Sequence, residues 1–567
     1  MGGGERKRPT GPLQALGVVA TTGVAALILH AHRLVGDLVS SNNDLRVHYR
    51  WTVEFVTAVR GGDPYPRWMP LANQGLGEPA LLFYAPLYYY ATAVVGYFTR
   101  DTWTAMKLVE FVGIWASGLF AYAALRRLCP LGWSLAGAVT VQAAPMIFML
   151  FHFFNGLPWA LSFTAAMAAV AFSVRPAPRR VVDVPLAAAL AVVVSTHTLS
   201  GLMVLICLPF VNVRHLVGPA NSAGRTRPVI AWGVSALLGV GLTMVYLFPA
   251  LRARHLIMSE AWVTEYTYYN AFIFSTVTYV LYGMRWMTFQ WPLPLVLLGS
   301  TIAATWYVVK SQERRDGSWA ALAGLVSVAW VSLFLCSELS YPLWALPSPL
   351  KLVQYPHRFL YVTTAVGLVA NVICLQRVWS ENYARRVALL VALPLVGSVL
   401  MTGTMYAKFT LVDARPSGIR GDTVGPHRGL PEYLTRTVGP DWERYVQDGG
   451  LDSECAARRA KCHETAVSGR TRRWRMDARE ATTIRLPVFA FPAWTVGLDG
   501  RALTSTIDQS TGLIAIELPA GRHEVSLTWA GLPSERTGLV LSGVSLGLLM
   551  GLAAMERFTR AKGGSQT

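Results

Sequence analysis

The chain has 567 residues, of which 53% are hydrophobic and only 14% are charged, and its mean hydropathy is +0.38. Soluble domains carry about a quarter charged residues, so this composition excludes a soluble multidomain protein. Fifty Lys and Arg against 32 Asp and Glu give a net charge of +18. Because the basic residues fall mostly between apolar runs, we interpret the charge as membrane topology and contact with anionic membrane lipids. We expect no nucleic-acid partner.

Long apolar runs predict membrane-spanning helices along most of the chain. The first run, residues 13–32, follows a basic start and lacks the small-residue cleavage site of a signal peptide, so we expect an anchor. Further runs occupy residues 105–125, 131–150, 157–172, 181–213, 229–247, 293–309, 320–335, 359–375, 387–405 and 539–555.

Basic clusters near the ends of these runs predict their orientation, because positively charged loops stay in the cytoplasm. The clusters occupy residues 6–8, 126–127, 175–180, 214–227, 310–315, 377–386 and 557–562. One arrangement fits all of them if the run 181–213 is a hairpin of two short helices that turns near "STHTLSG". It has about 12 crossings with both termini in the cytoplasm. The long segments 33–104, 250–291, 336–358 and 407–537 then lie outside.

The Tyr-rich run 81–98 is assigned to helices that lie at the membrane interface. A crossing there would put Arg126 and Arg127 outside and reverse every later basic cluster. The consecutive residues Tyr88 to Tyr90 suit interfacial depth.

From about residue 473 the apolar pattern changes to period two, with an Asp-Gly turn at 499–500. This predicts an antiparallel sandwich or jelly roll of roughly six to eight strands. Trp494 and Trp529 either stack on sugar rings or, as is commoner in alternating strands, belong to the core.

The predicted fold class is an all-α polytopic membrane protein with a C-terminal extracytoplasmic β domain. We expect a transmembrane domain over residues 1–406, in which the outer loop 33–104 carries the interfacial helices. An extracytoplasmic domain follows over 407–537, mainly β from about 473, and residues 538–567 form a final helix with a basic cytoplasmic tail.

Two of the six cysteines, Cys455 and Cys462, lie together in the extracytoplasmic segment and predict a local disulfide. Metal binding there, with His463, is the weaker alternative because no second pair of ligands is near. The other four cysteines lie in or beside apolar runs and are interpreted as packing residues.

The outer loop 33–104 holds the densest group of polar residues. Asp44 and His48 are four residues apart in a predicted helix, with Ser41 or Asn43 as its cap, so they share one face. A carboxylate beside an imidazole at the membrane surface can accept a proton from a hydroxyl nucleophile. The structural alternative for Asp44 is a carboxylate that the helix dipole stabilises.

Other candidates lie in stiff or membrane-adjacent loops. Arg67, Asn73 and Glu78 belong to a Pro-rich loop that can position side chains, although Arg67 is equally explained as an interfacial anchor. Arg358 follows His357 where a crossing begins, and there it either binds a phosphate with its planar fork or extends to the interface.

The remaining candidates lie near the predicted outer ends of crossings. Arg252 begins the loop 250–291, and His197 lies at the predicted hairpin turn. A lone histidine is more often structural, but ionisable groups at membrane depth are candidates by default. The sequence contains no P-loop, dinucleotide fingerprint, HExxH motif or nucleophile elbow.

Several segments together carry a resemblance to a known family. They are "NDLRVHYRWTVEFVTAVRGGDPYPRWMPLANQGLGEPALLFYAPLYYY", "THTLSG", "YLFPAL", "LKLVQYPHRFL" and "AFPAWTVGLDG". The chain resembles, over most of its length, the bacterial membrane family labelled 6-pyruvoyl-tetrahydropterin synthase-related. That family is similar in layout to the GT-C glycosyltransferases, in which an acidic residue of the first outer loop lies near the acceptor. The label does not imply pterin chemistry.

The resemblance implies a hexosyl- or pentosyltransferase of the bacterial inner membrane with an extracytoplasmic active site. The donor would be a polyprenyl-phosphate sugar, and the acceptor a glycan, a lipid or a protein. The resemblance itself carries over only Asp44, as the acidic residue of the first outer loop, and Arg358, as the family's arginine. We predict Asp44 and His48 as catalytic residues, Arg358, Arg67 and Arg252 as donor-phosphate ligands, and His357, His197, Glu78 and Asn73 as substrate contacts.

This sequence departs from the family pattern at two positions. GT-C chains often have two acidic residues one apart, whereas position 46 is Arg46, and His357 stands where Trp is expected. We therefore assign no cofactor and keep a divalent cation as an alternative. A transporter or flippase of lipid-linked glycans and a non-catalytic scaffold for envelope assembly remain the alternative functions.

Overall fold

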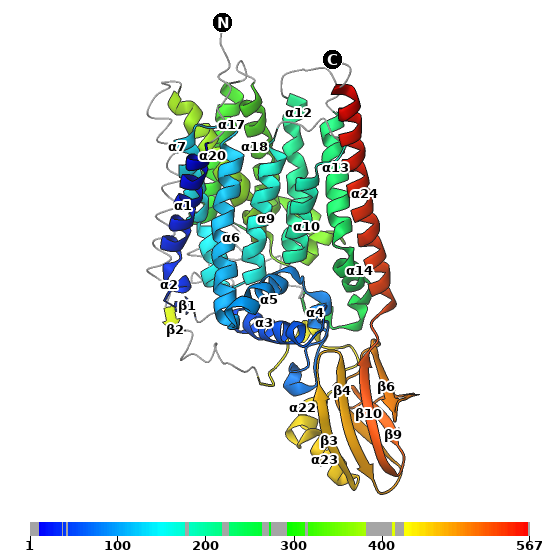
Figure 1. The fold of residues 1–567 in the computed structure, drawn as a ribbon. Helices are drawn as coiled ribbons and strands as arrows, with labels where there is room; N and C mark the ends of the chain where they lie inside the picture. The colour runs from blue at the N-terminus through cyan, green and yellow to red at the C-terminus, as the bar shows by residue number, and fades with distance from the viewer. Residues whose placement is uncertain are drawn as a thin grey trace.

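The structure is a computed structural model in which a bundle of long helices stands above a small β domain (Figure 1). It describes residues 11–36, 38–40, 44–175, 181–217, 226–262, 272–273, 292–311, 316–380, 411–413 and 425–564. The predicted fold class, a polytopic helical protein with a C-terminal β domain, is confirmed.

Eight helical segments of the described residues are long and apolar enough to cross a membrane, so the chain is an integral membrane protein. They contain α1 (Pro12–Leu29), α6 (Thr102–Leu125), α7 (Leu131–Gln142), α11 (Thr198–Cys207), α17 (Pro292–Lys310), α18 (Gly317–Cys336), α20 (Leu360–Ser380) and α24 (Pro533–Gly564). Several of these segments include the short helices that continue them, such as α8 (Pro145–Phe148) after α7 and α12 (Val213–Val217) after α11.

Three further predicted crossings correspond to shorter or bent helices. The helices α9 (Leu157–Ser173) and α10 (Val184–Thr196) are apolar but short. The predicted run 229–247 breaks at Thr243, where α13 (Thr226–Leu242) meets α14 (Met244–Ala253) at a bend of 70°. The predicted crossing 387–405 lies outside the described residues.

The predicted hairpin in the run 181–213 is present, and His197 forms its turn. This residue is the C-cap of α10 and the N-cap of α11, where its ring nitrogen accepts the N–H of Ser200 at 3.2 Å. An imidazole thus takes the place that a Ser or Asp side chain commonly fills at a helix start.

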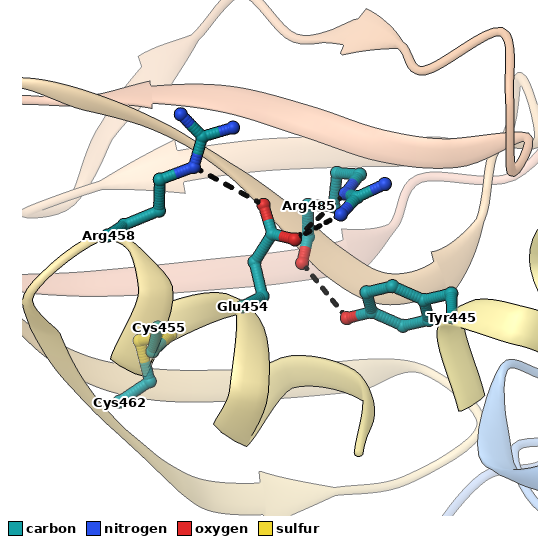
Figure 2. Close-up of a disulfide and its surroundings, with 6 residues drawn as sticks. All are labelled: Tyr445, Glu454, Cys455, Arg458, Cys462 and Arg485. Carbon is teal, nitrogen blue, oxygen red and sulfur yellow. Dashed lines mark hydrogen bonds and ion pairs between the residues drawn. A yellow bond between two sulfur atoms is a disulfide. The ribbon is translucent and has the colours of Figure 1, made fainter. Parts of the chain in front are cut away.

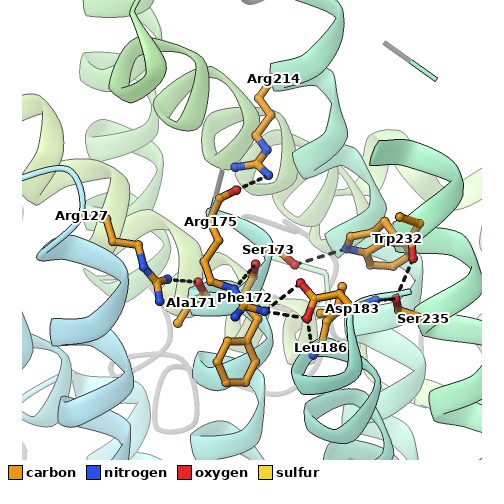
Figure 3. Close-up of polar contacts among 11 residues, drawn as sticks. Arg127, Ala171, Phe172, Ser173, Arg175, Asp183, Leu186, Arg214, Trp232 and Ser235 are labelled. Atoms are coloured by element: carbon orange, nitrogen blue, oxygen red, sulfur yellow. Dashed lines mark hydrogen bonds and ion pairs between the residues drawn. The ribbon is translucent and has the colours of Figure 1, made fainter. Parts of the chain in front are cut away.

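Arginines gather at the end of the bundle opposite the β domain, which we call the basic end (Figures 1 and 3). Arg175 pairs with Asp183 at 2.6 Å, and Asp183 also caps α10 by accepting the N–H of Leu186. Arg214 donates to the carbonyl of Arg175 at 2.7 Å, and Arg127 donates to that of Ala171 at 2.6 Å. These bonds satisfy carbonyls at the C-terminus of α9 that have no helical partner.

Three helices lie across the opposite end of the bundle, which we call the α3 end (Figure 1). They are α3 (Leu45–Arg60), α4 (Ala80–Phe83) and α5 (Leu87–Thr99). The run 81–98 is therefore helical without forming a spanning segment. Tyr88 and Tyr89 are fully buried because α5 packs against α3 and α6, and the interfacial depth expected of these tyrosines stays a prediction.

The β domain consists of two antiparallel sheets with the strand orders β3-β4-β10-β6-β7 and β5-β9-β8. The strands are β3 (Ala460–Val467), β4 (Thr471–Ala478), β5 (Thr482–Phe489), β6 (Trp494–Leu498), β7 (Arg501–Leu503), β8 (Thr506–Ile507), β9 (Leu513–Leu518) and β10 (Gly521–Trp529). The first strand, β3, begins earlier than the predicted residue 473. The prediction missed it because β3 is an edge strand with mostly exposed side chains and has no alternating apolar pattern.

A disulfide joins Cys455 in α23 (Gly450–Ala457) to Cys462 in the edge strand β3 (Figure 2). Beside it, Glu454 forms an ion pair with Arg485 of β5. The hydroxyl of Tyr445 donates to the carbonyl of Arg485 at 3.4 Å. The helical segment before the sheets is thus fixed to both of them.

The β domain is seated on the 33–104 loop through aromatic packing. Trp68 is buried, with its ring 5.4 Å from that of Trp494 and 5.8 Å from that of Trp529. Both β-domain tryptophans are less than 10% exposed, so the core interpretation is confirmed and sugar stacking on them is excluded. The N–H of Phe489 also donates to the carbonyl of Leu76 at 3.1 Å.

Gly77 lets this contact form. Its φ is +82°, and a Cβ there would overlap the indole of Trp68. We expect Gly77→Ala to destabilise the protein by about 1–3 kcal/mol, as overpacking does. The matched control is Gly75→Ala, since Gly75 has a φ of +93° but open space around a Cβ. Thermal melting in detergent should show the larger loss for Gly77→Ala, and equal losses would contradict the role of Trp68.

Candidate functional site at the α3 end of the bundle

Asp44 begins α3 but does not cap it. It occupies the N-cap position without a side-chain capping bond, and its backbone N–H donates to the carbonyl of Phe154 at 3.3 Å. The side chain is exposed, and its carboxylate has no hydrogen-bond partner in the described part of the chain. Burial nevertheless raises the pKa of Asp44, while the charge of Arg358 lowers it in part. Neighbouring residues thus partly enclose the carboxylate, and the charge of Arg358 acts on it. We call the surroundings of Asp44 and Arg358 the recess.

Arg358 is held from one edge and open on the other. In η9 (Pro356–Phe359) its Nη1 donates to the carbonyl of Val353 at 3.0 Å and to Oε1 of Gln354 at 2.8 Å. Gln354 has a φ of +66°, a strained value for a residue with a side chain. The other guanidinium nitrogens have no hydrogen-bond partner among the residues that the structure describes. Half of the planar fork thus remains available for an anion.

A tryptophan that sequence reasoning missed completes this wall of the recess. The guanidinium of Arg358 lies 5.3 Å from the ring centroid of Trp159, and the ring of His197 stacks on Trp159 at 5.8 Å. The indole N–H of Trp159 is buried and has no partner among the described residues. The only signal in the sequence is the position of Trp159 at the start of α9, directly after the break at Gly156.

The contacts that the structure gives His48 are with aromatic residues, and its expected assistance to Asp44 stays a prediction. Its Nδ1 lies 3.1 Å from the hydroxyl of Tyr89, and its ring packs edge-on against Trp51 and Tyr84. Burial lowers the pKa of His48 to about 3, so it stays neutral at physiological pH. Aromatic side chains surround His48 and bury it beside the recess.

Asn73 and Glu78 form a separate buried cluster rather than part of the recess. Asn73 Nδ2 donates to Glu78 Oε2 at 3.2 Å, and Asn73 Oδ1 accepts the N–H of Gly429 at 3.1 Å. Nearby, Glu54 accepts the N–H of Leu71 at 3.0 Å and lies 3.6 Å from His427. Burial raises the pKa of both glutamates to about 8 and lowers that of His427 to about 4, so all three are neutral near pH 6.

This cluster predicts a pH dependence of stability. A carboxyl whose folded pKa exceeds its unfolded value stabilises the fold below the unfolded pKa, and this stability is lost as pH rises toward the folded pKa. Between about pH 5.5 and about pH 7, where Glu78 would be ionised in the unfolded chain but neutral in the fold, we expect Glu78 to lower stability by about 1.4 kcal/mol per pH unit. Glu78→Gln should remove this contribution and leave that of Glu54. Melting curves across this range test it, with exposed Glu443→Gln as the control. An unchanged slope in Glu78→Gln would rule out a buried neutral carboxyl.

The remaining predicted site residues have other neighbours in the described part of the chain. Arg67 is buried, pairs with Glu535 of α24 at 3.2 Å and lies over the ring of Tyr65. Arg252 is exposed on α14. His357 stacks on Tyr355, which also lies under the Arg358 guanidinium. Within the described ranges, no group of three or more His, Cys, Asp or Glu side chains is arranged to hold a metal ion.

Comparisons with known proteins give distant structural similarities. No family model matches the chain, and no curated protein matches it. Among solved structures, the arabinofuranosyltransferase AftD from Mycobacteria is similar with a TM-score of 0.45 and 13% identity. The alignment covers 91% of this chain and 40% of AftD, so the chain spans less than half the length of that protein.

A second similarity is to ArnT from Cupriavidus metallidurans, solved with bound undecaprenyl phosphate. Its TM-score is 0.30 at 15% identity, with 65% of this chain and 79% of ArnT covered. Because both scores are below 0.5, these similarities carry no argument about function.

Proposed function

We propose that the chain is a membrane glycosyltransferase that moves a sugar from a polyprenyl-phosphate donor to an extracytoplasmic acceptor, which is a glycan, a lipid or a protein. The observation that supports this proposal is the pairing of an unpartnered carboxylate, Asp44, with a half-open guanidinium, Arg358, in one recess. A base and an anion-binding group are the two elements that transfer from a phosphosugar requires.

The transfer step follows from these two groups. Asp44 takes the proton of the acceptor hydroxyl, and the acceptor oxygen forms a bond to the anomeric carbon of the donor. The bond between that carbon and the phosphate oxygen breaks, and its electron pair leaves with the polyprenyl phosphate. Burial makes Asp44 a stronger base by raising its pKa. Arg358 neutralises the charge that develops on the departing phosphate.

We assign the phosphate to Arg358 in preference to Arg67, because Glu535 already pairs with Arg67. Exposed Arg252 adds positive charge at the α3 end without contacting the recess. The stack of His197 and Trp159 beside Arg358 suits contact with the donor, since the buried indole N–H can donate to an oxygen of the sugar or the phosphate.

The proposed orientation places the basic end in the cytoplasm of a bacterial inner membrane and the recess outside. A lipid-linked donor fits this orientation, because a polyprenyl tail carries the sugar within the bilayer to the recess. Both α1 and α24 would then have their terminal ends in the cytoplasm. Labelling of a single cysteine introduced at position 44 with a membrane-impermeant reagent in intact cells tests the orientation. Protection of that cysteine would place the recess on the wrong side.

Sugar transfer itself is tested with the purified full chain. Radiolabelled polyprenyl-phosphate hexose or pentose is incubated with alkyl glycosides, lipid and peptide acceptors, with and without a divalent cation. Covalent label on an acceptor is the expected result. Movement of the label across a proteoliposome membrane without covalent transfer would favour the flippase alternative. If the label is neither transferred nor moved, the scaffold alternative is favoured.

A further inference from the structure

A segment at the start of the extracytoplasmic domain lies across the recess. We infer that this segment, residues 427–438 and here called the strap, places Glu432 beside Asp44 to bind a second hydroxyl of the acceptor, so that the acceptor is a sugar with neighbouring hydroxyls. This inference rests on the proposed function and names the acceptor class that the proposal leaves open.

The strap is fixed at its first end to the 33–104 loop. The N–H of His427 donates to the carbonyl of Leu71 at 3.0 Å, and the N–H of Gln74 donates to the carbonyl of His427 at 2.9 Å. Gly429 is covered so closely by Glu78 and Asn73 that a Cβ would overlap the Glu78 carboxylate. This end therefore cannot shift without opening the buried carboxyl cluster.

The second end of the strap is fixed to the chain that follows α14. The N–H of Met258 donates to the carbonyl of Leu434 at 3.0 Å, and the N–H of Arg436 donates to that of Leu256 at 2.9 Å. Ile257 and Thr435 form an antiparallel bridge between these bonds. Two segments distant in sequence thus hold the strap, and its middle turn is fixed between them.

The middle turn packs on the face of α3 that begins with Asp44. Tyr433 is 1% exposed, and its ring meets that of Trp51 edge-on at 5.4 Å. Trp51 in turn packs against Tyr84 at 5.1 Å. Since Trp51 shares its helix face with Asp44 and His48, the turn η10 (Pro431–Tyr433) lies over the wall of the recess.

Glu432, the residue before Tyr433 in this turn, is half-buried. Burial and the charge of Asp44 raise its pKa, and the Tyr84 hydroxyl is influenced by both carboxylates. Asp44 and Glu432 both act on Tyr84, so the three groups are neighbours. On the α3 side the rings of Trp51 and Tyr84 pack together, whereas the guanidinium of Arg358 lies over Trp159 and also acts on Tyr84.

Two neighbouring carboxylates suit a sugar better than a simple alcohol. Each can accept a hydrogen bond from one of two adjacent ring hydroxyls, while Asp44 alone takes the proton of the attacking one. A serine side chain or a lipid alcohol offers a single hydroxyl, so it would leave Glu432 without a partner. A site built to bond a substrate hydroxyl discriminates strongly against an analogue that lacks it.

The test compares Glu432→Gln with wild type in the purified full chain, using a labelled undecaprenyl-phosphate sugar and a panel of octyl glycosides. We expect the KM for the best octyl glycoside to rise about tenfold or more in Glu432→Gln, the loss of one charged hydrogen bond, with donor KM unchanged. For wild type, the KM for the glycoside should rise by a similar factor when the hydroxyl next to the attacking one is removed. On that deoxy acceptor, wild type and variant should have the same KM.

The controls separate this role from folding and from cation binding. Glu432→Asp should recover part of the acceptor affinity, and Glu443→Gln, at an exposed glutamate paired with Arg428, should match wild type. Equal KM values for wild type and Glu432→Gln, with transfer intact, would overturn the inference and leave the transferase proposal standing. Reversal of the Glu432→Gln defect by added Mg²⁺ or Mn²⁺ would also overturn it, in favour of a cation ligand. Absence of transfer by wild type from any donor would remove the transferase proposal and the inference together.

Discussion

Asp44→Asn should lower the rate of the proposed sugar transfer by about 10²–10⁴-fold, the range that a positioned general base contributes. The amide has the shape of the carboxylate but cannot take the proton of the acceptor hydroxyl. Because the Asp44 side chain makes no capping bond, the substitution should not weaken α3. The measurement is kcat with labelled donor and the best acceptor, together with a melting curve of the detergent-solubilised variant.

A second N-cap aspartate supplies the control. Asp441 also begins a helix, α22 (Trp442–Gln447), is exposed and lacks a side-chain capping bond, but it lies in the linker region before the β domain. Asp441→Asn should therefore keep wild-type kcat and melting temperature. Full activity in Asp44→Asn would remove Asp44 from the mechanism, and equal losses in both variants would point to an unspecific effect of the substitution.

Arg358→Gln should reduce transfer by about 10²–10³-fold, as removal of one charge-stabilising donor does. It should also weaken binding of sugar-free undecaprenyl phosphate, because the open edge of the guanidinium is lost. Arg358→Lys keeps the charge without the planar fork and should recover only part of both losses. Binding is measured by fluorescence titration and transfer by the radiolabel assay, so affinity and kcat are read separately.

Arg254→Gln is the matched control for charge at the same end of the bundle. Arg254 donates to Ser259 at 3.1 Å and contacts neither Asp44 nor Arg358, so the variant should bind undecaprenyl phosphate as wild type does. Arg358 also holds Val353 and Gln354, so the melting temperature of each variant is compared first. Wild-type phosphate affinity in a stable Arg358→Gln variant would assign the donor phosphate to another group.

Much of the bundle could be predicted because its signals are local. Apolar runs of spanning length and basic clusters between them place the helices, and the same alternation brings Asp44, His197 and Arg358 to one end. The juxtaposition of Asp44 and Arg358 followed from that topology. The bend between α13 and α14 could not be predicted from that topology, since the apolar run continues across Thr243.

The missed residues depend on contacts between segments far apart in the chain. Glu432 comes to Asp44 only because the strap pairs with the 33–104 loop at one end and with residues 256–258 at the other. Nothing near Glu432 in the sequence signals these pairings. The aromatic contacts of His48 were missed for a related reason, because helical spacing fixes a shared face but not which side chains cover it.

The ion pair between Arg67 and Glu535 has a consequence for biosynthesis. The 33–104 loop is translated well before the glutamate that pairs with it and before the strap that packs on α3. A nascent chain would therefore insert its earlier helices while the recess still lacks one side. Closure of the recess waits for α24 to insert, so the maturation of this end of the bundle depends on a segment made much later than α3.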